Sequence, residues 1–92
     1  MGDRILGLGD SLASFVQVME EKLRANAHKG GWRACTMGYL LRRLGEETAE
    51  LRRAIKAGKP RAEVVREAAD VANFCMMIAD TYHPTPDSGG AR

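Results

Sequence analysis

The feature that most constrains this chain is the stretch after Pro60, whose apolar residues lie on almost every side of the helix that it predicts. At about 100° of rotation per residue, the apolar positions from 64 to 78 cover well over half of the helix circumference. Such a helix has to be surrounded by other helices. Two more helices from one short chain can scarcely do this. The pattern therefore predicts a bundle of four-helix type shared with a partner chain, in a homodimer or homotetramer.

Two earlier stretches also have the apolar periodicity of amphipathic helices, at about residues 11–27 and 36–57. Asp10 or Ser11 can cap the first of them. Thr36 can cap the second, because its hydroxyl can accept a hydrogen bond from a free amide of the first turn. We therefore expect three main helices and an all-α fold.

Turn residues separate the second helix from the third. Gly58 fits the stop of the second helix, and Pro60 fits the first turn of the third, which runs to about residue 82. Gly-rich and Pro-rich segments at the two ends of the chain resemble flexible tails. The sequence predicts one domain over residues 1–92, with a core at about 11–82 and tails at 1–9 and 83–92.

Composition argues against two classes of partner and for one compartment. The fourteen Lys and Arg residues are scattered in ones and twos, whereas a nucleic-acid interface would need a contiguous basic run with aromatics. No stretch is apolar enough to span a membrane, and the N-terminus lacks a signal-peptide pattern, so we expect a cytoplasmic protein. Cys35 and Cys75 are far apart, and we expect reduced thiols, with Cys75 in the core.

Acidic residues occur in pairs three positions apart on the second and third helices. Glu47 and Glu50 project from one side of the second helix, and Glu67 and Asp70 from one side of the third. These pairs border apolar faces, where ionised acids are costly unless they are paired, neutralised or metal-bound. Oxygen ligands without His or Cys favour Mg²⁺, with Mn²⁺ able to substitute. The spacing therefore predicts a four-carboxylate metal site.

A second interpretation is that the Glu-rich turn is an exposed surface. On this interpretation Glu46 and Glu50 pair with arginines of the same helix, namely Arg42, Arg43 and Arg53. Exposed pairs of this kind contribute only about a few tenths of a kcal/mol. This interpretation explains Glu67 and Asp70 poorly, since the single arginine near them points to another face.

The motif EExxE, followed after sixteen residues by ExxD, resembles that of the MazG-like all-α nucleoside triphosphate pyrophosphatases. This superfamily also contains the dimeric dUTPases and phosphoribosyl-ATP pyrophosphohydrolase. The similarity extends from about residue 12 to residue 82 and includes the HKGGW loop. It implies hydrolysis of a nucleoside triphosphate, with a dNTP as the favoured substrate, to the monophosphate and pyrophosphate. The implied Mg²⁺ ligands are Glu47, Glu50, Glu67 and Asp70.

The resemblance also implies that the nucleotide lies against residues before the second helix and after Asp70. Lys29 and Arg33 would contact phosphates, which suits their charge. Trp32 would stack on a base, although packing over the end of the bundle explains it equally well. Asn73 offers a donor and an acceptor to a base edge or sugar, or it is a polar position opposite the core.

The catalytic role among the acids falls to Glu46 and Glu47. Glu46 is angled away from the metal pair and could accept a proton from water or hold another ligand in place. The small loop with a single Trp favours a purine deoxynucleotide. Two alternatives stay open: phosphoribosyl-ATP hydrolysis by the same carboxylates, and a non-catalytic helical adaptor whose acids pair with arginines.

Overall fold

The computed structural model describes residues 2–27 and 30–84, with side chains from Gly9 onwards. It consists of three helices, α1 (Gly2–Ala25), α2 (Met37–Lys56) and α3 (Arg61–Thr81), and the described residues form no strand. The predicted all-α class and its three helices are confirmed. None of the three helices, within these residues, has the length and apolar character needed to cross a membrane.

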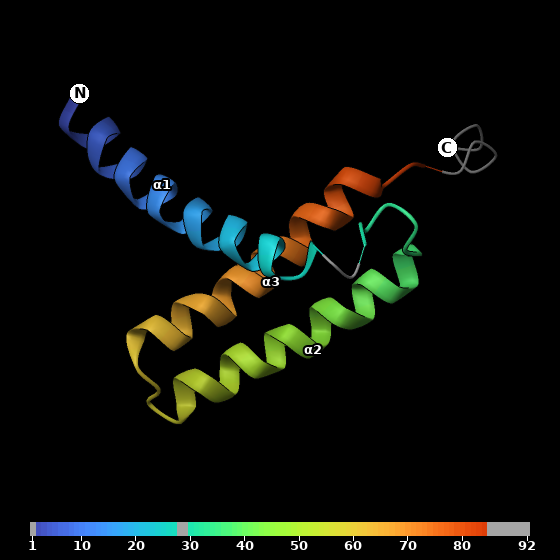
Figure 1. Ribbon diagram of the computed structural model, residues 1–92. Helices are drawn as coiled ribbons and strands as arrows, with labels where there is room; N and C mark the ends of the chain where they lie inside the picture. Colours follow the sequence, from blue (N-terminus) through green and yellow to red (C-terminus); the bar gives the residue numbers. More distant parts are fainter. Residues whose placement is uncertain (1, 28–29, 85–92) are drawn as a thin grey trace.

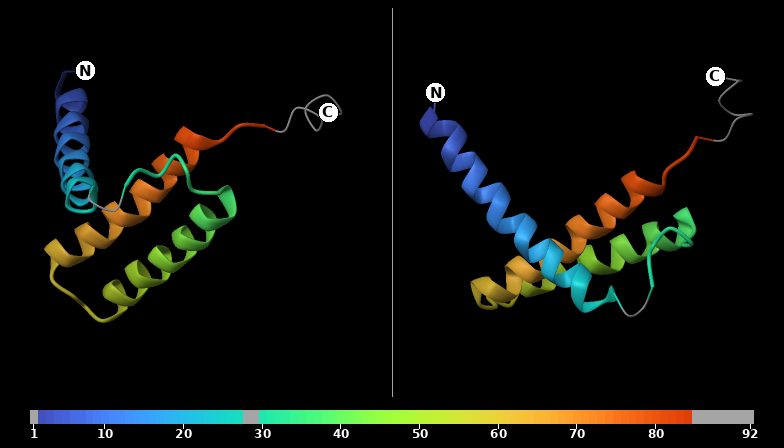
Figure 2. Two further views of the ribbon diagram at one scale, coloured as in Figure 1. Left: turned by 45° about the vertical axis from the view of Figure 1, so that its right-hand side comes forward. Right: turned by 45° about the horizontal axis from the view of Figure 1, so that its top comes forward.

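The helix α3 is the centre of the arrangement. It lies antiparallel beside α2, to which it is joined by a short turn (Figure 1). The helix α1 packs against α3 but not against α2. It crosses α3 at a steep angle, and its N-terminal half extends away from the other two helices (Figure 2). The helices α1 and α2 do not pack on each other, and their side chains come near one another only where both helices lie beside the middle of α3.

The ends of α2 and α3 follow the predicted signals. The Thr36 hydroxyl accepts a hydrogen bond from the Tyr39 amide at 3.1 Å, which is the expected N-terminal cap. Gly58 has a φ of 67°, the left-handed conformation that glycine adopts without steric cost after a helix. Pro60 then caps α3, one residue earlier than its predicted place in the first turn. These local interactions fix where the two acidic helices begin and end.

The predicted start of α1 was wrong. A flexible tail was expected over residues 1–9 with a cap at Asp10 or Ser11, yet the helix begins at Gly2. Glycine costs only about 1 kcal/mol relative to alanine in a helix, and Ile5, Leu6 and Leu8 continue the apolar character of α1 towards its N-terminus. The C-terminal tail from residue 85 lies outside the described residues.

The core of one chain is small. Among the described residues, the buried apolar side chains are Leu40, Ala54 and Ala69. Large apolar residues are exposed on α1 and α2, including Leu12, at 57% exposure, and Leu41, at 54%. Cys75 is also exposed, so its predicted burial in the core was wrong for the single chain. The apolar residues of α3 lie on most sides of the helix, so its two neighbouring helices leave some of them, such as Cys75, uncovered.

Candidate metal and nucleotide site

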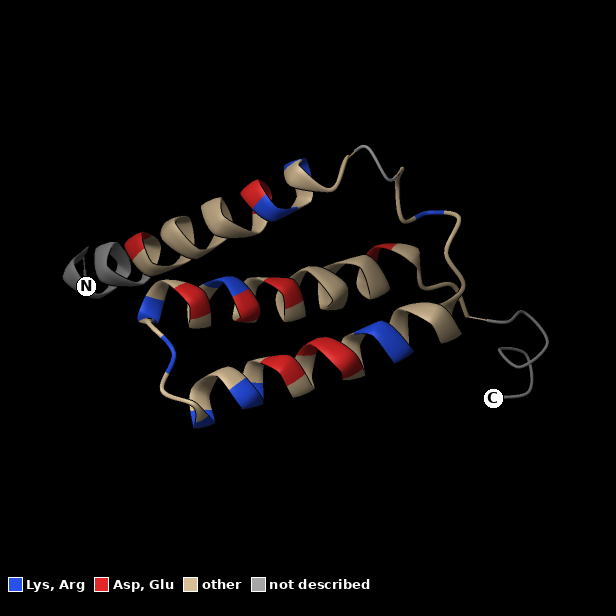
Figure 3. Cartoon of the chain, turned by 60° about the horizontal axis from the view of Figure 1, so that its bottom comes forward, with Lys and Arg blue, Asp and Glu red and all other residues tan. Residues whose placement is uncertain are grey.

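The paired acids of α2 and α3 face one another across the hairpin. One carboxylate oxygen from each of Glu47, Glu50 and Glu67 lies within 4.8 Å of the other two. Figure 3 shows the acidic stretches of the two helices side by side. The i, i+3 spacing places each pair on one side of its helix, and the antiparallel packing of α2 on α3 brings the two sides together. We refer to Glu47, Glu50 and Glu67 as the carboxylate cluster.

Glu47 is the most buried member of the cluster, at 7% exposure. Its burial raises the pKa of the carboxyl group, and the negative charges of Glu50 and Asp70 raise it further. A hydrogen bond from Arg43 Nη2 to Glu47 Oε2, at 2.9 Å, acts in the opposite direction. The Arg43 guanidinium therefore offsets part of the free-energy cost of burying the Glu47 carboxylate.

Glu67 supplies the cluster's side from α3. Burial raises its pKa, and the neighbouring Glu50, Asp70 and Glu47 carboxylates raise it further. Its Oε1 atom is buried and accepts no hydrogen bond from the described residues. Burying a carboxylate oxygen without a hydrogen-bond donor costs folding free energy. A proton or a bound cation at this atom would remove that cost.

Asp70 lies next to the cluster and has a cationic partner of its own. Its Oδ2 atom is 3.1 Å from Lys22 Nζ, and the two side chains are 23% and 21% exposed. Its charge still contributes to the raised pKa values of Glu47 and Glu67. The structure thus brings three of the four predicted ligands together and holds the fourth beside them through an ion pair with α1.

Glu46 lies outside the cluster. Its side chain is 50% exposed and pairs with Arg42 and Arg43 on the same helix. This is the arginine pairing that the surface interpretation expected for Glu46 and Glu50. Among the described residues it is present at Glu46, whereas Glu50 makes no ion pair. Arg43 contacts both Glu46 and Glu47, so Glu46 reaches the cluster only through this guanidinium.

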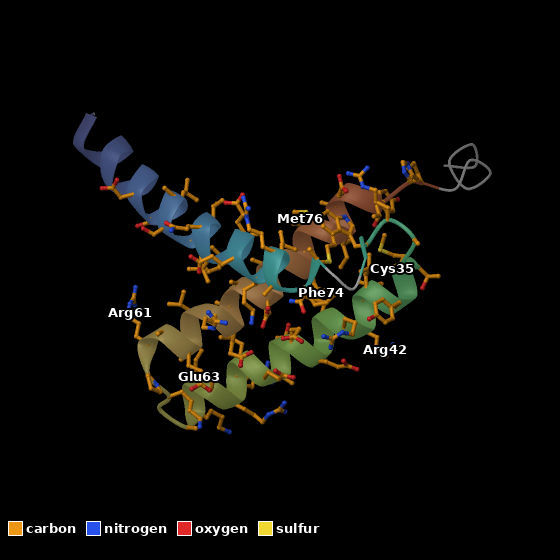
Figure 4. All side chains as sticks on the ribbon, in the orientation of Figure 1. Cys35, Arg42, Arg61, Glu63, Phe74 and Met76 are labelled. Carbon is orange, nitrogen blue, oxygen red and sulfur yellow. The ribbon has the colours of Figure 1, made fainter. Side chains whose placement is uncertain are left out.

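Two adjoining pockets lie beside the cluster. The first, of about 290 Å³, has charged and apolar residues in its lining, and we call it the acidic pocket; its polar residues include Lys22, Arg43, Glu47, Asp70 and Asn73. The second, of about 400 Å³, we call the tryptophan pocket; its lining includes Gly31, Trp32, Cys35 and Leu40. Both pockets share Leu23, Asn26, Tyr39, Phe74 and Met77. Figure 4 shows Phe74 on the side of α3 that faces α2.

The predicted nucleotide-binding loop reaches only part of this site. Trp32 is half-buried, lines the tryptophan pocket and donates a hydrogen bond from Nε1 to Asp80 Oδ2 at 3.0 Å. Arg33 also pairs with Asp80, at 3.4 Å, and its side chain is 80% exposed. It is therefore directed to the C-terminal end of α3 and away from the carboxylate cluster. Lys29 lies outside the described residues.

Asn73 is buried at 3% exposure, which is inconsistent with a polar position opposite the core. Its Nδ2 atom donates a hydrogen bond to the Met19 carbonyl at 3.1 Å, joining α3 to α1. Its Oδ1 atom is buried and accepts no hydrogen bond from the described residues, and Asn73 lines the acidic pocket. The amide nitrogen thus has a structural role, whereas the amide oxygen keeps an unused capacity to accept a hydrogen bond.

Two basic residues of the site were not among the predicted ones. Arg43 had a sequence signal, since it precedes Glu47 by one helical turn, but it was interpreted only as a surface partner. Lys22 had none, because its contact with Asp70 depends on how α1 crosses α3. Such a crossing is not encoded in the spacing of residues along one helix.

The residues present fit a divalent cation with a preference for oxygen. Ligand oxygens on one octahedral Mg²⁺ lie about 3–4 Å apart, for metal–oxygen distances of about 2.1 Å. The oxygens of the cluster, within 4.8 Å of one another, need only a small movement of flexible side chains to reach that spacing. The undonated Glu67 Oε1 is a second indication of fit. Glu47, Glu50, Glu67 and the adjacent Asp70 are therefore candidate ligands.

The fold and the cluster together define a class of protein, an all-α domain with a carboxylate site suited to a divalent cation. Residues 12–83 match the family described as phosphoribosyl-ATP pyrophosphohydrolase. The match covers most of the chain, and the protein belongs to this family, within the MazG-like all-α NTP pyrophosphohydrolase superfamily. The family indicates a metal-dependent pyrophosphohydrolase acting on an acid anhydride. No curated protein and no solved structure matched the chain.

The raised pKa values of Glu47 and Glu67 predict how stability depends on pH. The folded chain binds protons at these sites more tightly than the unfolded chain, whose glutamates have the ordinary pKa of about 4.5. In EDTA, the free energy of unfolding should therefore fall as pH rises from about 4.5 through the raised pKa values. Thermal unfolding at a series of pH values measures this dependence.

The matched variants for this measurement are Glu67→Gln and Glu63→Gln, since Glu63 lies one turn earlier on α3 and is exposed. Glu67→Gln should raise the melting temperature at pH 7 in EDTA and flatten the pH dependence, because a buried charge is removed. Glu63→Gln should leave both nearly unchanged. A melting temperature lowered at pH 7 by Glu67→Gln would mean that the carboxylate is a structural anchor.

Proposed function

We propose that the protein hydrolyses the α–β phosphoanhydride of a nucleoside triphosphate or a triphosphate-bearing nucleotide, releasing a nucleoside monophosphate and pyrophosphate. The observation that carries this proposal is the convergence of carboxylate oxygens from two helices, with a buried Glu67 oxygen that no donor satisfies. The family match supports the reaction type. Convergent carboxylates are the ligand set that proteins use to hold metal ions against phosphates.

The metal that we propose is Mg²⁺, with Mn²⁺ able to substitute, held by Glu47, Glu50, Glu67 and Asp70. When bound, the ion would neutralise phosphate charge, align the α-phosphorus and lower the pKa of the attacking water. The four side chains come from two helices that are fixed by their caps and by the short turn between them. That rigidity would hold the reacting groups in place without further rearrangement.

The acceptor of the water's proton in this proposal is Glu47. Its carboxyl is the most buried of the carboxylate cluster and lies at the proposed metal site, where it would be within reach of a water that the metal activates. The position of Glu46 does not favour the same role, since it is half exposed and paired with two arginines. We propose instead that Glu46 positions Arg43, whose guanidinium lines the acidic pocket where phosphates would lie.

The two pockets suggest a direction for the substrate. The tryptophan pocket has the aromatic and apolar lining that suits a base, and both Trp32 and Phe74 belong to this lining. The acidic pocket adjoins it and borders the metal ligands, so sugar and phosphates would lie there, within reach of Asn73. Arg33 lines neither pocket and pairs with Asp80, so its phosphate contact, like that of Lys29, stays a prediction from the sequence.

Phosphoribosyl-ATP is the first candidate substrate, because the matched family carries this name. A dNTP, which the sequence suggested, is the second candidate, and the tryptophan pocket accommodates a purine base of either. A non-catalytic helical adaptor is the alternative from another class. The pairing of Arg43 with Glu46 and Glu47 favours it, but the cluster's undonated Glu67 oxygen does not.

We propose further that the working unit is a homodimer or a tetramer of two such dimers. One chain buries few large apolar side chains among the described residues and leaves Leu12, Val16, Leu41 and Ile55 more than half exposed. The N-terminal half of α1 extends from the hairpin without covering α3. A second copy would bury these faces and complete a four-helix-type bundle.

Loss of one carboxylate should abolish most of the activity. Glu67→Gln keeps the shape and removes a proposed ligand, so kcat for Mg²⁺-dependent pyrophosphate release should fall about 100-fold or more. Glu63→Gln, on the same helix, should stay within about two-fold, because surface substitutions of this kind have small effects. Equal activities of both variants, or full activity in EDTA, would contradict the proposed metal chemistry.

Trp32→Ala should raise KM for the preferred substrate by about ten-fold, the scale of one base-stacking contact. The preferred substrate is found first, by pyrophosphate detection on phosphoribosyl-ATP and on all NTPs and dNTPs. Asp80→Ala is the control, since it removes the hydrogen-bond partner of Trp32 but leaves the indole. If the two variants lose stability together and KM is unchanged, Trp32 serves packing alone.

Light scattering after gel filtration should give a dimer or tetramer at micromolar concentration. The double variant Leu12→Glu/Val16→Glu introduces charges on the exposed apolar face of α1 and should shift the protein towards monomer. Gln17→Glu adds a charge at an exposed position next to Val16 and should leave the assembly intact. A folded wild-type monomer would rule out the shared bundle.

A further inference from the structure

Lys22 makes the one ion pair, among the described residues, that joins two helices. Its Nζ atom lies 3.1 Å from Asp70 Oδ2, and both side chains are mostly buried. The other ion pairs of the described residues lie within one helix or tie a loop residue to α3. A lysine near the C-terminal end of α1 is thus placed against a carboxylate that borders the cluster.

Lys22 and Arg43 line the acidic pocket together, but they are held in different ways. Arg43 donates to both Glu46 and Glu47, and its guanidinium lies 5.1 Å from the Phe74 ring centroid. Three partners therefore fix that side chain. Among the described residues, Lys22 has one ion-pair partner, Asp70, and its four-carbon stem is flexible. Of the two cations, Lys22 is the one that can change partner at small cost.

The neighbouring carboxylates give Lys22 a reason to change partner. Asp70 lines the acidic pocket together with Glu47 and follows Glu67 by about one turn of α3, so a cation held by the cluster would attract Asp70 as well. Such a cation and Lys22 Nζ would compete for one carboxylate. An ammonium displaced from Asp70 would lie in a pocket of about 290 Å³, roughly the room of ten water molecules and enough for a phosphate chain.

We propose that Lys22 is a phosphate-binding residue that Asp70 holds in position. When a divalent cation takes Asp70, Lys22 Nζ moves to a phosphate oxygen of the nucleotide in the acidic pocket. This inference rests on the proposed function, whose metal and substrate it uses. The exchange conserves charge, because one Lys–carboxylate pair becomes a metal–carboxylate pair and a Lys–phosphate pair. Lys22 thereby couples nucleotide binding to metal binding across α1 and α3.

The coupling predicts two effects of opposite sign for Lys22→Met, which keeps most of the stem and removes the charge. Without nucleotide, the variant should bind Mn²⁺ about three- to ten-fold more tightly than wild type, because a competing cation is gone. With saturating Mn²⁺, it should bind α,β-methylene-ATP about ten-fold or more weakly, the scale of one charge-assisted hydrogen bond. Electron paramagnetic resonance of free Mn²⁺ and calorimetry with the analogue measure the two affinities.

Two further variants separate charge from structure. Lys22→Arg keeps a cation and should bind the analogue within about three-fold of wild type. Arg24→Met removes an exposed cation two residues away that pairs with Glu20, and it should alter neither affinity by more than about two-fold. If Lys22→Met does not fold, Lys22→Gln with the same two measurements replaces it.

The outcomes also separate this inference from the proposed function. Weaker binding of both Mn²⁺ and the analogue by Lys22→Met, or no change in either, would show that Lys22 only joins α1 to α3. If wild type nevertheless binds Mn²⁺ with Glu67 as a ligand, the proposed function stands even though the inference about Lys22 fails. Wild type that does not bind Mn²⁺ would overturn both proposals together.

Discussion

The repulsion between carboxylates that face one another across the α2–α3 hairpin is the constraint on which the rest of this structure depends. Glu47 and Glu67 lose hydration as the helices pack, and each feels the negative charge of its neighbours, so the pKa of both is raised. Desolvated like charges oppose folding unless protons or cations offset them. The hairpin therefore accommodates an unfavourable cluster where its two helices pack against each other. A purely structural interface has no need of such a cluster.

The cations of the chain are arranged around this cluster in two different ways. Arg43 is part of α2 and is fixed by Glu46, Glu47 and the face of Phe74. Lys22 comes from α1 and reaches Asp70 only because α1 crosses α3 near its middle. The same crossing places the buried Asn73 amide against the Met19 carbonyl. The position of α1 thus decides which polar groups border the acidic pocket, although the carboxylate cluster comes entirely from the other two helices.

The single chain buries little of its apolar surface, and the reason is geometrical. The apolar residues of α3 cover most of its circumference, but α2 and α1 contact only parts of it. Cys75 is therefore exposed, although the apolar sequence of α3 is typical of a helix in a protein core. This is why we connect the site to an assembly of chains: the helix that carries Glu67 and Asp70 would be held in position by a second copy as well as by its own neighbours.

The sequence by itself determined the helices and the composition of the acidic pairs. Thr36 and Gly58 act on residues a few positions away, so their roles as helix cap and helix stop could be predicted. The i, i+3 spacing of the acidic pairs could be predicted for the same reason, because it depends only on the geometry of one helix. The start of α1 could not, because weak glycine penalties are outweighed over a long helix. The pairing of Glu46 with Arg42 and Arg43 lies within about one turn of α2, and the surface interpretation of the sequence expected it. Only the tertiary structure decided that Arg33 and Trp32 meet at Asp80 and that Lys22 reaches Asp70. These contacts depend on the angles and offsets between packed helices and on the path of a loop, which follow from three-dimensional packing and not from periodicity along one helix.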